Sequence, residues 1–191
     1  MIGEFFIIGG KIGKEIGKIF RTKSDLVLDI GSGSNPHYHR NIKGKITCFD
    51  KIKSRKTDIV GDANNIGEYF GSESFDKVIC VNSFYYFKDP FKVVNKVHNI
   101  LKNDGVFVMV LPFLYPIHDV PEDRYRFTEF GLRTLLEDDF KKIKIKVIGG
   151  LFNIPAVLVH VSMKGLKHVI PRNLNFIKEI IMLIIYPIYF I

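Results

Sequence analysis

Several classes of protein are excluded by what the chain has little of. Two cysteines in 191 residues are too few for a disulfide scaffold. Cys48 and Cys80 both lie in β-prone apolar runs, so we expect reduced thiols in a buried core. The uncharged run at residues 180–191 is shorter than the roughly 20 residues that span a bilayer. With no internal repeat, low-complexity tract or linker, the length fits one domain.

Signals for secretion and for metal binding are also missing. Glu4 lies where a signal peptide would carry positive charge, and the apolar run at residues 5–8 is too short. We therefore expect a cytoplasmic protein. The histidines show no ligand spacing with other metal-binding side chains, so no metal is expected; they include His37, His39, His160 and His168.

Basic residues outnumber acidic ones. The 28 lysines and arginines against 20 aspartates and glutamates give a formal charge of +8, which suits an anionic partner or surface. The lysines are scattered, and Lys142, Lys144 and Lys146 alternate with apolar residues as on the solvent face of an edge strand. Nucleic acid is therefore not expected as a partner, whereas peripheral contact with the inner face of a membrane stays an open alternative.

The most informative segment is a strand that runs into a glycine turn. Residues 26–33 read Leu-Val-Leu-Asp-Ile-Gly-Ser-Gly, which is typical of the first strand and nucleoside-binding turn of an α/β sheet. Pro36 stands where a dinucleotide fingerprint has its third glycine, and it removes one N–H from the phosphate cradle. Asp29 would repel phosphates but attract an ammonium group. S-adenosyl-L-methionine, a nucleoside with an α-amino acid end and no phosphate, fits this turn.

A second acid follows at the spacing expected for binding a ribose. Asp50 ends the β-prone run at residues 45–50 and lies 19 residues after Gly31. Each oxygen of a carboxylate can accept a hydrogen bond from one hydroxyl of a vicinal diol. The alternative is a surface aspartate that caps a loop.

In these segments the chain resembles a class I S-adenosylmethionine-dependent methyltransferase of the small kind called type 11. The resemblance also includes residues 61–63 as the turn facing the adenine, residues 75–82 as the fourth strand and residues 101–108 as a helix end and fifth strand. It implies a doubly wound, mostly parallel, Rossmann-like α/β sheet with S-adenosyl-L-methionine as cofactor. The cofactor-binding residues predicted in this way are Asp29, Gly31, Ser32, Gly33, Asp50, Lys51, Asp62, Ala63 and Asn82.

Further elements are predicted after the fourth strand. Asp89 and Pro90 supply an N-cap and a first-turn proline, and apolar residues recur at helical spacing until Asp104-Gly105, where we expect the helix to end. Thr128 is a good N-cap for another helix. A sixth strand is expected at about residues 142–148.

Substrate contacts are expected on the loop at residues 111–127, because long loops at the carboxyl edge of a rigid sheet tend to carry function. We expect His118 to act as general base for an acceptor hydroxyl or protonated amine, with Asp119 or Asp123 orienting its ring. The alternative is an ion-paired clasp that holds the loop shut. Aromatic residues after Asn82, where many relatives have a polar turn, complete the predicted substrate contacts: Tyr85, Tyr86, Tyr115, His118, Arg124 and Arg126.

Three regions are predicted: an N-terminal amphipathic segment at residues 1–23, a methyltransferase domain at 24–150 and an apolar, helical C-terminal extension at 151–191. The extension either packs on the domain or faces a membrane, and a chain cut off before the family's seventh strand is the third alternative. We expect a methyltransferase acting by in-line displacement on a small-molecule, sugar or lipid-linked acceptor. The alternative is a non-catalytic interaction module of this fold at the membrane surface.

Overall fold

The computed structural model describes residues 3–148, with side chains from residue 10 onward. These residues belong to two units. The larger comprises Gly13–Phe113 and Ile117–Ile145 and contains the whole sheet, while the described residues of the smaller are 3–12, 114–116 and 146–148. The predicted region boundaries at residues 23 and 150 stay predictions. The C-terminal extension at 151–191 and any seventh strand in it lie outside the described residues.

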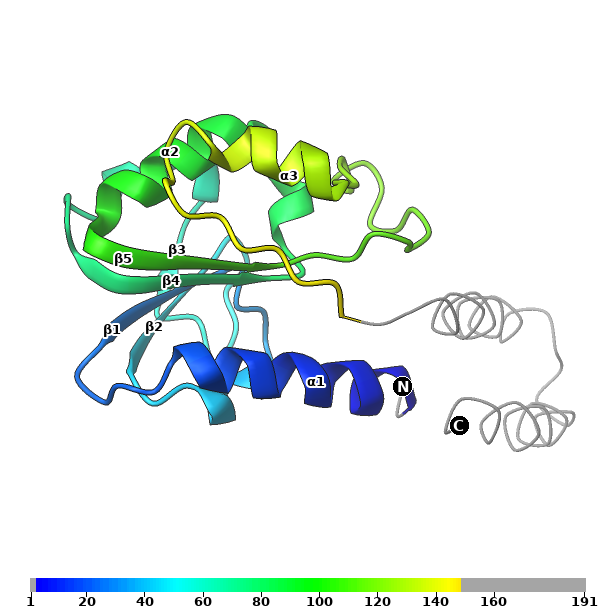
Figure 1. Ribbon diagram of the computed structural model, residues 1–191, viewed down its shortest axis with the longest axis horizontal. Helices are drawn as coiled ribbons and strands as arrows, with labels where there is room; N and C mark the ends of the chain where they lie inside the picture. Colours follow the sequence, from blue (N-terminus) through cyan, green and yellow to red (C-terminus); the bar gives the residue numbers. More distant parts are fainter. Residues whose placement is uncertain (1–2, 149–191) are drawn as a thin grey trace, which may run out of the picture. The chain divides into compact units, whose positions relative to one another are not determined.

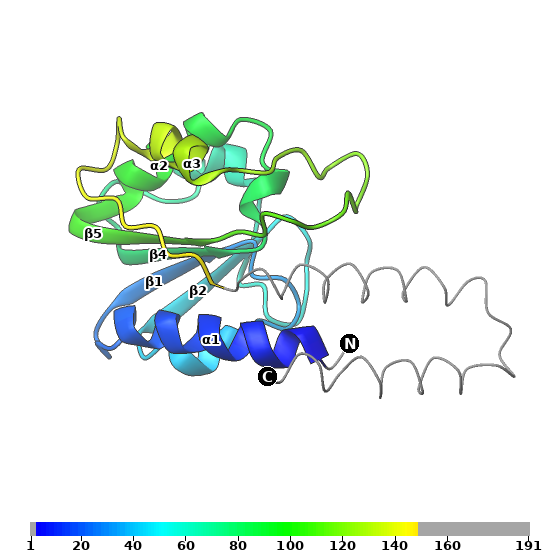
Figure 2. The same cartoon turned by 45° about the vertical axis from the view of Figure 1, so that its right-hand side comes forward.

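Five parallel strands form one sheet in the order β3-β2-β1-β4-β5. Helices α2 and α3 cover one face of this sheet, and the second half of α1 lies against the other (Figures 1 and 2). The predicted doubly wound parallel α/β sheet is thus confirmed. The strands are β1 (Leu26–Ile30), β2 (Lys45–Asp50), β3 (Ile59–Val60), β4 (Phe75–Val81) and β5 (Leu101–Val110); the helices are α1 (Gly3–Ile19), α2 (Pro90–Ile100) and α3 (Glu129–Leu136), with short 3-10 helices η1 (His37–Asn41), η2 (Ala63–Glu68) and η3 (Phe84–Tyr86).

The strand order reverses at β1, because the chain runs outward from β1 to β3 and then crosses to β4 on the other side of β1. Ligands of such sheets bind outside the carboxyl ends of the strands at this switch point. The residues that follow β1 and β4 therefore decide what the fold binds.

Alternate side chains of the central strands fill the core beneath α2 and α3. Leu28 and Ile30 of β1 and Val78 and Cys80 of β4 are fully buried in one cluster with the apolar face of α2. Both cysteines are free and buried, as predicted. Burial raises the pKa of the Cys48 thiol to about 11 and that of the Cys80 thiol to about 12, so both stay protonated at neutral pH.

Both predicted helix starts are confirmed. The Asp89 side chain accepts a hydrogen bond from the backbone N–H of Lys92 at 3.2 Å, with Pro90 in the first turn of α2. The Thr128 hydroxyl accepts one from the backbone N–H of Gly131 at 3.0 Å and begins α3.

The predicted end of the first of these helices is wrong, because α2 stops at Ile100 and Leu101 already pairs with Phe75 in the sheet. The Asp104-Gly105 pair lies inside β5, where Asp104 has a φ of 61° and the register against β4 shifts. A left-handed residue beside a glycine marks a bulge as readily as a helix end, and here it is a bulge.

The predicted sixth strand at residues 142–148 is also wrong, since this segment has no strand in the structure. Solvent exposure does alternate along the segment: Lys142 and Lys144 are exposed, and Ile143 and Ile145 are half-buried. A strand needs a hydrogen-bonded partner as well as an alternating pattern, and within residues 3–148 the only partner of β5 is β4.

Helix α1 forms despite glycines that favour other conformations, because its second half packs on the domain. Ile16 and Phe20, which follow one another on that side, are 2% and 0% exposed. A Cβ on Gly13 would lie 2.7 Å from Asn41 Nδ2, so glycine permits the close approach of η1. None of the helices in residues 3–148 is long and apolar enough to cross a membrane.

Candidate active site

The predicted cofactor-binding residues converge at the carboxyl ends of four neighbouring strands. Backbone hydrogen bonds tie the glycine turn after β1 to the end of β2: the Gly31 N–H donates to Phe49 O at 2.8 Å and the Gly33 N–H donates to Asp50 Oδ2 at 2.8 Å. Asp62 and Ala63 follow β3, and Asn82 follows β4. The structure therefore assembles the whole predicted set on one edge of the sheet.

Glycine is required in the turn for two separate reasons. Gly31 and Gly33 have φ values of 70° and 64°, in the left-handed region that other residues enter at a cost. A Cβ on Gly31 would also lie 2.3 Å from Ser83 Oγ, whose hydroxyl donates to Ile30 O at 2.9 Å. Around Gly33 none of the described atoms lies within 4 Å of a Cβ position, so the described part of the chain leaves the turn open on that side.

The difference between the two glycines gives a matched pair of variants. Gly33→Ala should destabilise the fold by about 1 to 2 kcal/mol, the cost of a left-handed backbone. Gly31→Ala should cost about 1 to 3 kcal/mol more than Gly33→Ala, because its methyl group overlaps Ser83. Urea unfolding of both variants measures this difference, and equal stabilities would mean that Ser83 does not pack on Gly31.

Asp50 is held through both of its carboxylate oxygens. Oδ2 accepts from the Gly33 N–H of the turn and Oδ1 accepts from the Ile52 N–H of the loop after β2, each at 2.8 Å. A carboxylate oxygen has two lone pairs, so each oxygen retains the capacity to accept from one hydroxyl of a vicinal diol.

Asp29 is the buried acid of the site, with a side chain that is 0% exposed. Its Oδ2 accepts from the Tyr38 hydroxyl at 2.7 Å and is 2.5 Å from His39 Nε2. Its Oδ1 is buried and has no hydrogen-bond partner among the described residues. Burial raises the pKa of this carboxyl group, with the bonds from His39 and Tyr38 opposing the shift.

Tyr38 and His39 were missed as site residues by reasoning from sequence. They lie on η1 and reach Asp29 through space, so no spacing along the chain signals them. Asp29, His39 and Cys48 also bring one metal-ligand atom each to within 4.8 Å of one another, a grouping that histidine spacing alone does not reveal. The absence of a metal stays a prediction.

The other predicted cofactor residues differ in their surroundings. Asp62 caps η2 with Oδ1, which accepts from the backbone N and the Nδ2 of Asn64 at 2.9 and 2.7 Å. Although burial opposes it, these bonds and the charges of nearby lysines lower the pKa of Asp62. Asn82 has a φ of 53°, a strained backbone of the kind that collects at functional sites. Ser32 and Ala63 are buried, and Lys51 is exposed.

His118 is bound on both sides of its ring. Its Nδ1 is 3.1 Å from Asp123 Oδ2, and its Nε2 is 3.1 Å from the Tyr86 hydroxyl and 3.3 Å from the Tyr85 hydroxyl. Asp119 is farther, with Oδ2 3.8 Å from Nε2. Of the two acids considered for orienting the ring, Asp123 therefore has the better geometry.

Asp123 is held as a carboxylate by its own partners. Its side chain is 1% exposed and receives two hydrogen bonds from Arg126, at 2.5 and 2.7 Å, and one from the backbone N–H of His118 at 3.0 Å. The Arg126 guanidinium holds the pKa of Asp123 well below its usual range. An ionised Asp123 favours a proton on His118 Nδ1 and leaves Nε2 as the hydrogen-bond acceptor.

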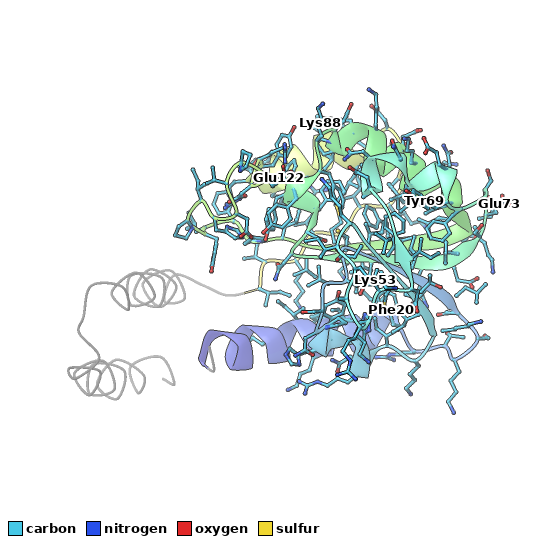
Figure 3. All side chains as sticks on the ribbon, turned by 180° about the vertical axis from the view of Figure 1, so that it is seen from behind. Phe20, Lys53, Tyr69, Glu73, Lys88 and Glu122 are labelled. Carbon is cyan, nitrogen blue, oxygen red and sulfur yellow. The ribbon has the colours of Figure 1, made fainter. Side chains whose placement is uncertain are left out.

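The loop that carries His118 is anchored on η3. Arg124 donates to the carbonyl of Tyr86 at 3.0 Å and to Glu122 Oε2 at 2.8 Å. Figure 3 shows Glu122 at the opposite end of β4 from Glu73, which lies just before that strand. The ion pairs of the clasp alternative are thus present together with the geometry of the base.

The two halves of the site are connected at β4. Ser83 packs on Gly31, and Tyr85 follows two residues later, a span of at most about 7 Å. The Arg124 guanidinium lowers the pKa of Glu122, with smaller effects from the charges of Lys51 and Asp62 on the cofactor side. Tyr115 belongs to the other unit, so its substrate role stays a prediction.

Comparison with known proteins gives the same result as the geometry. The family model described as a methyltransferase domain matches residues 28–109. MJ1252 of Methanocaldococcus jannaschii, an uncharacterized protein, is 26% identical over 127 residues, which are 63% of this chain and 45% of that protein. The chain thus spans about half the length of this curated relative.

Solved structures share the fold at low sequence identity. YcgJ of Bacillus subtilis has a TM-score of 0.56 at 18% identity over 68% of each chain. The 1,6-didemethyltoxoflavin-N1-methyltransferase of Burkholderia thailandensis, solved with 1,6-didemethyltoxoflavin and S-adenosylhomocysteine, has a TM-score of 0.56 at 16% identity, covering 76% of this chain and 72% of that one.

The strand order, the glycine turn and the acid after β2 define the fold of a class I S-adenosylmethionine-dependent methyltransferase. S-adenosyl-L-methionine is the cofactor of this class. Because the methyltransferase-domain model matches residues 28–109 and the fold is the same, the resemblance predicted from the motifs is confirmed.

Proposed function

We propose that the protein transfers a methyl group from S-adenosyl-L-methionine to a small-molecule acceptor, including sugars and small lipid-linked compounds. The observation that carries the proposal is the buried Oδ1 of Asp29, which has no hydrogen-bond partner among the described residues. Asp29 lies two residues before the glycine turn, and Asp50 at the end of the next strand accepts from Gly33 in that turn. An unpaired buried carboxylate oxygen is costly, and a bound ammonium group would satisfy it.

The described residues fit the cofactor at three points. Asp29 Oδ1 suits the ammonium of the amino acid end, the spare lone pairs of Asp50 suit the ribose hydroxyls, and the open space at Gly33 lets the backbone approach the ligand. The turn of Asp62 and Ala63 would face the adenine, beside Lys51 and Asn82. Bound there, the cofactor supplies an electrophilic methyl group on a sulfonium.

The catalytic role falls to His118. Its Nε2 accepts a proton from the acceptor group while Asp123 holds Nδ1 and fixes the orientation of the ring. The remaining lowering of the barrier comes from holding the nucleophile in line with the methyl group, which is a matter of positioning. Asp119, the predicted catalytic partner, contacts the hydroxyl of Tyr86 instead, with Oδ2 at 2.6 Å.

The cofactor assignment is tested with S-adenosylhomocysteine in calorimetry. Asp50→Ala should weaken binding by about 1.5 to 3 kcal/mol, the range for hydrogen bonds to a charged group. Asp138→Ala, which removes an exposed carboxylate beyond the end of α3, is the matched control and should leave the affinity unchanged. Unchanged affinity in Asp50→Ala, or tighter binding of a nicotinamide dinucleotide, would contradict the assignment.

Contact with a membrane and the non-catalytic alternative both depend on the C-terminal extension. That segment lies outside the described residues, so the peripheral location and the membrane-surface role stay predictions. The described geometry supports the enzyme, because the ionised Asp123 orients His118 and its Nε2 lies among the hydroxyls of Tyr85 and Tyr86.

A further inference from the structure

The surroundings of His118 combine two phenol rings with one carboxylate. The side chains of Tyr85, Tyr86 and Asp119 lie around Nε2 of His118, and we call these four residues the acceptor cluster. The rings of Tyr85 and Tyr86 are 4.3 Å apart between centroids, and the His118 ring lies 5.7 and 6.0 Å from them. Asp119 adds a carboxylate that is 68% exposed.

The carboxylate of Asp119 is the uncompensated charge of this cluster. Its polar contacts are the Tyr86 hydroxyl at 2.6 Å and His118 Nε2 at 3.8 Å, and within residues 3–148 it pairs with no lysine or arginine.

The nearby arginines are already committed to other groups. Arg126 binds both oxygens of Asp123, and Arg124 binds Glu122 and the carbonyl of Tyr86. These pairs cancel in charge, so the loop offers no spare guanidinium to a phosphate or carboxylate. An anionic acceptor would meet Asp119 with nothing to offset it.

Resting on the proposed function, we propose that the methyl acceptor is an amine that enters the acceptor cluster as its ammonium ion. The Arg126 guanidinium already lies over the Tyr85 ring, 5.4 Å from its centroid. The ring left for an ammonium group is therefore that of Tyr86, whose hydroxyl is hydrogen-bonded to the Asp119 carboxylate, and an aromatic face attracts such a cation. Burial raises the pKa values of Tyr85 and Tyr86, so both stay neutral phenols and add no charge of their own to the cluster.

The hydrogen bonds of the cluster allow Nε2 to take the proton. The Tyr86 hydroxyl can point its proton to Asp119 at 2.6 Å, and the Tyr85 hydroxyl can point its own to the Tyr86 oxygen at 3.4 Å. Nε2 is then the acceptor for one N–H of the ammonium. This N–H bond breaks as Nε2–H forms, its electron pair stays on nitrogen as the nucleophile, and the N–CH3 bond forms as the methyl–sulfur bond breaks with its electrons left on sulfur.

The test uses the full chain saturated with S-adenosylhomocysteine and two isosteric probes, benzylammonium and benzyl alcohol, titrated at neutral pH. Benzylammonium should bind about tenfold or more tightly than the alcohol. Asp119→Asn should weaken benzylammonium about tenfold and leave the alcohol unchanged, whereas Asp138→Asn, with the same change in net charge, should alter neither.

Equal binding of the two probes, no binding of benzylammonium at millimolar concentration, or an Asp119→Asn variant that holds benzylammonium as well as the parent would overturn the amine assignment. Product analysis gives a second readout. A cell extract incubated with the protein and ¹³C-methyl cofactor should yield N-methyl carbon signals, and O-methyl signals alone would overturn it. Loss of S-adenosylhomocysteine binding, in contrast, would overturn the proposed function and is measured separately.

Discussion

His118→Ala should lower turnover by about a hundredfold or more while cofactor affinity and the unfolding midpoint stay close to those of the parent. The imidazole is the group with an acceptor nitrogen facing the site, and alanine leaves the acceptor to lose its proton to water. Asp123 stays ionised and keeps its bond to the ring near neutral pH, because Arg126 holds its pKa well below its usual range.

The control for this prediction is His98→Ala, the same substitution on α2, where His98 packs edge-on to Phe140. Steady-state kinetics, calorimetry with S-adenosylhomocysteine and thermal unfolding are measured on both variants. A large drop in the midpoint of His118→Ala with turnover preserved at low temperature would favour the clasp over the base.

Asp29→Ala should destabilise the protein by about 1 to 3 kcal/mol for each hydrogen-bond partner that is left buried and unsatisfied. The Tyr38 hydroxyl and His39 Nε2 would both lose their acceptor beneath a buried turn. Denaturant unfolding gives the free energy directly. Asp29→Asn keeps the shape of the side chain and an oxygen that accepts from Tyr38, so we expect it to cost less than Asp29→Ala.

Glu129→Ala is the comparison for a surface ion pair. Glu129 and Arg133 are partners on α3 with about half of each side chain exposed, and such pairs contribute about 0.3 to 0.5 kcal/mol. If Asp29→Ala cost no more than Glu129→Ala, the hydrogen bonds of Asp29 would be incidental to the fold, and its proposed role at the cofactor would need another basis.

Site residues that come at or directly after the end of a strand could be predicted from the sequence. Contacts between side chains on different elements could not. Gly31 and Asp50 follow parallel strands, and parallel strands end at one edge, so their convergence follows from the pattern. Tyr38 reaches Asp29 from a 3-10 helix, and no periodicity encodes that contact. The choice of Asp123 over Asp119 as the partner of His118 likewise depends on loop geometry.

The two errors in the fold have a common physical origin. Asp104-Gly105 and the alternating lysines at residues 142–146 are local signals, and each is compatible with more than one structure. Because residues 101–110 pair with β4, Asp104-Gly105 forms a bulge inside β5. The alternating lysines have no hydrogen-bonded strand partner among the described residues, so their segment is not a strand. The starts of both helices were predicted correctly, because the side chains of Asp89 and Thr128 accept hydrogen bonds from backbone N–H groups only three residues away.

Ser83 ties the glycine turn to the start of η3. Its hydroxyl donates to Ile30 O, its side chain occupies the space beside Gly31, and Tyr85 follows two residues later. Under the proposed function, these contacts would set the separation between the bound cofactor and the tyrosines of the acceptor cluster. We therefore expect the alignment of the methyl group with the acceptor nucleophile to depend on Ser83, although its side chain is committed to the protein.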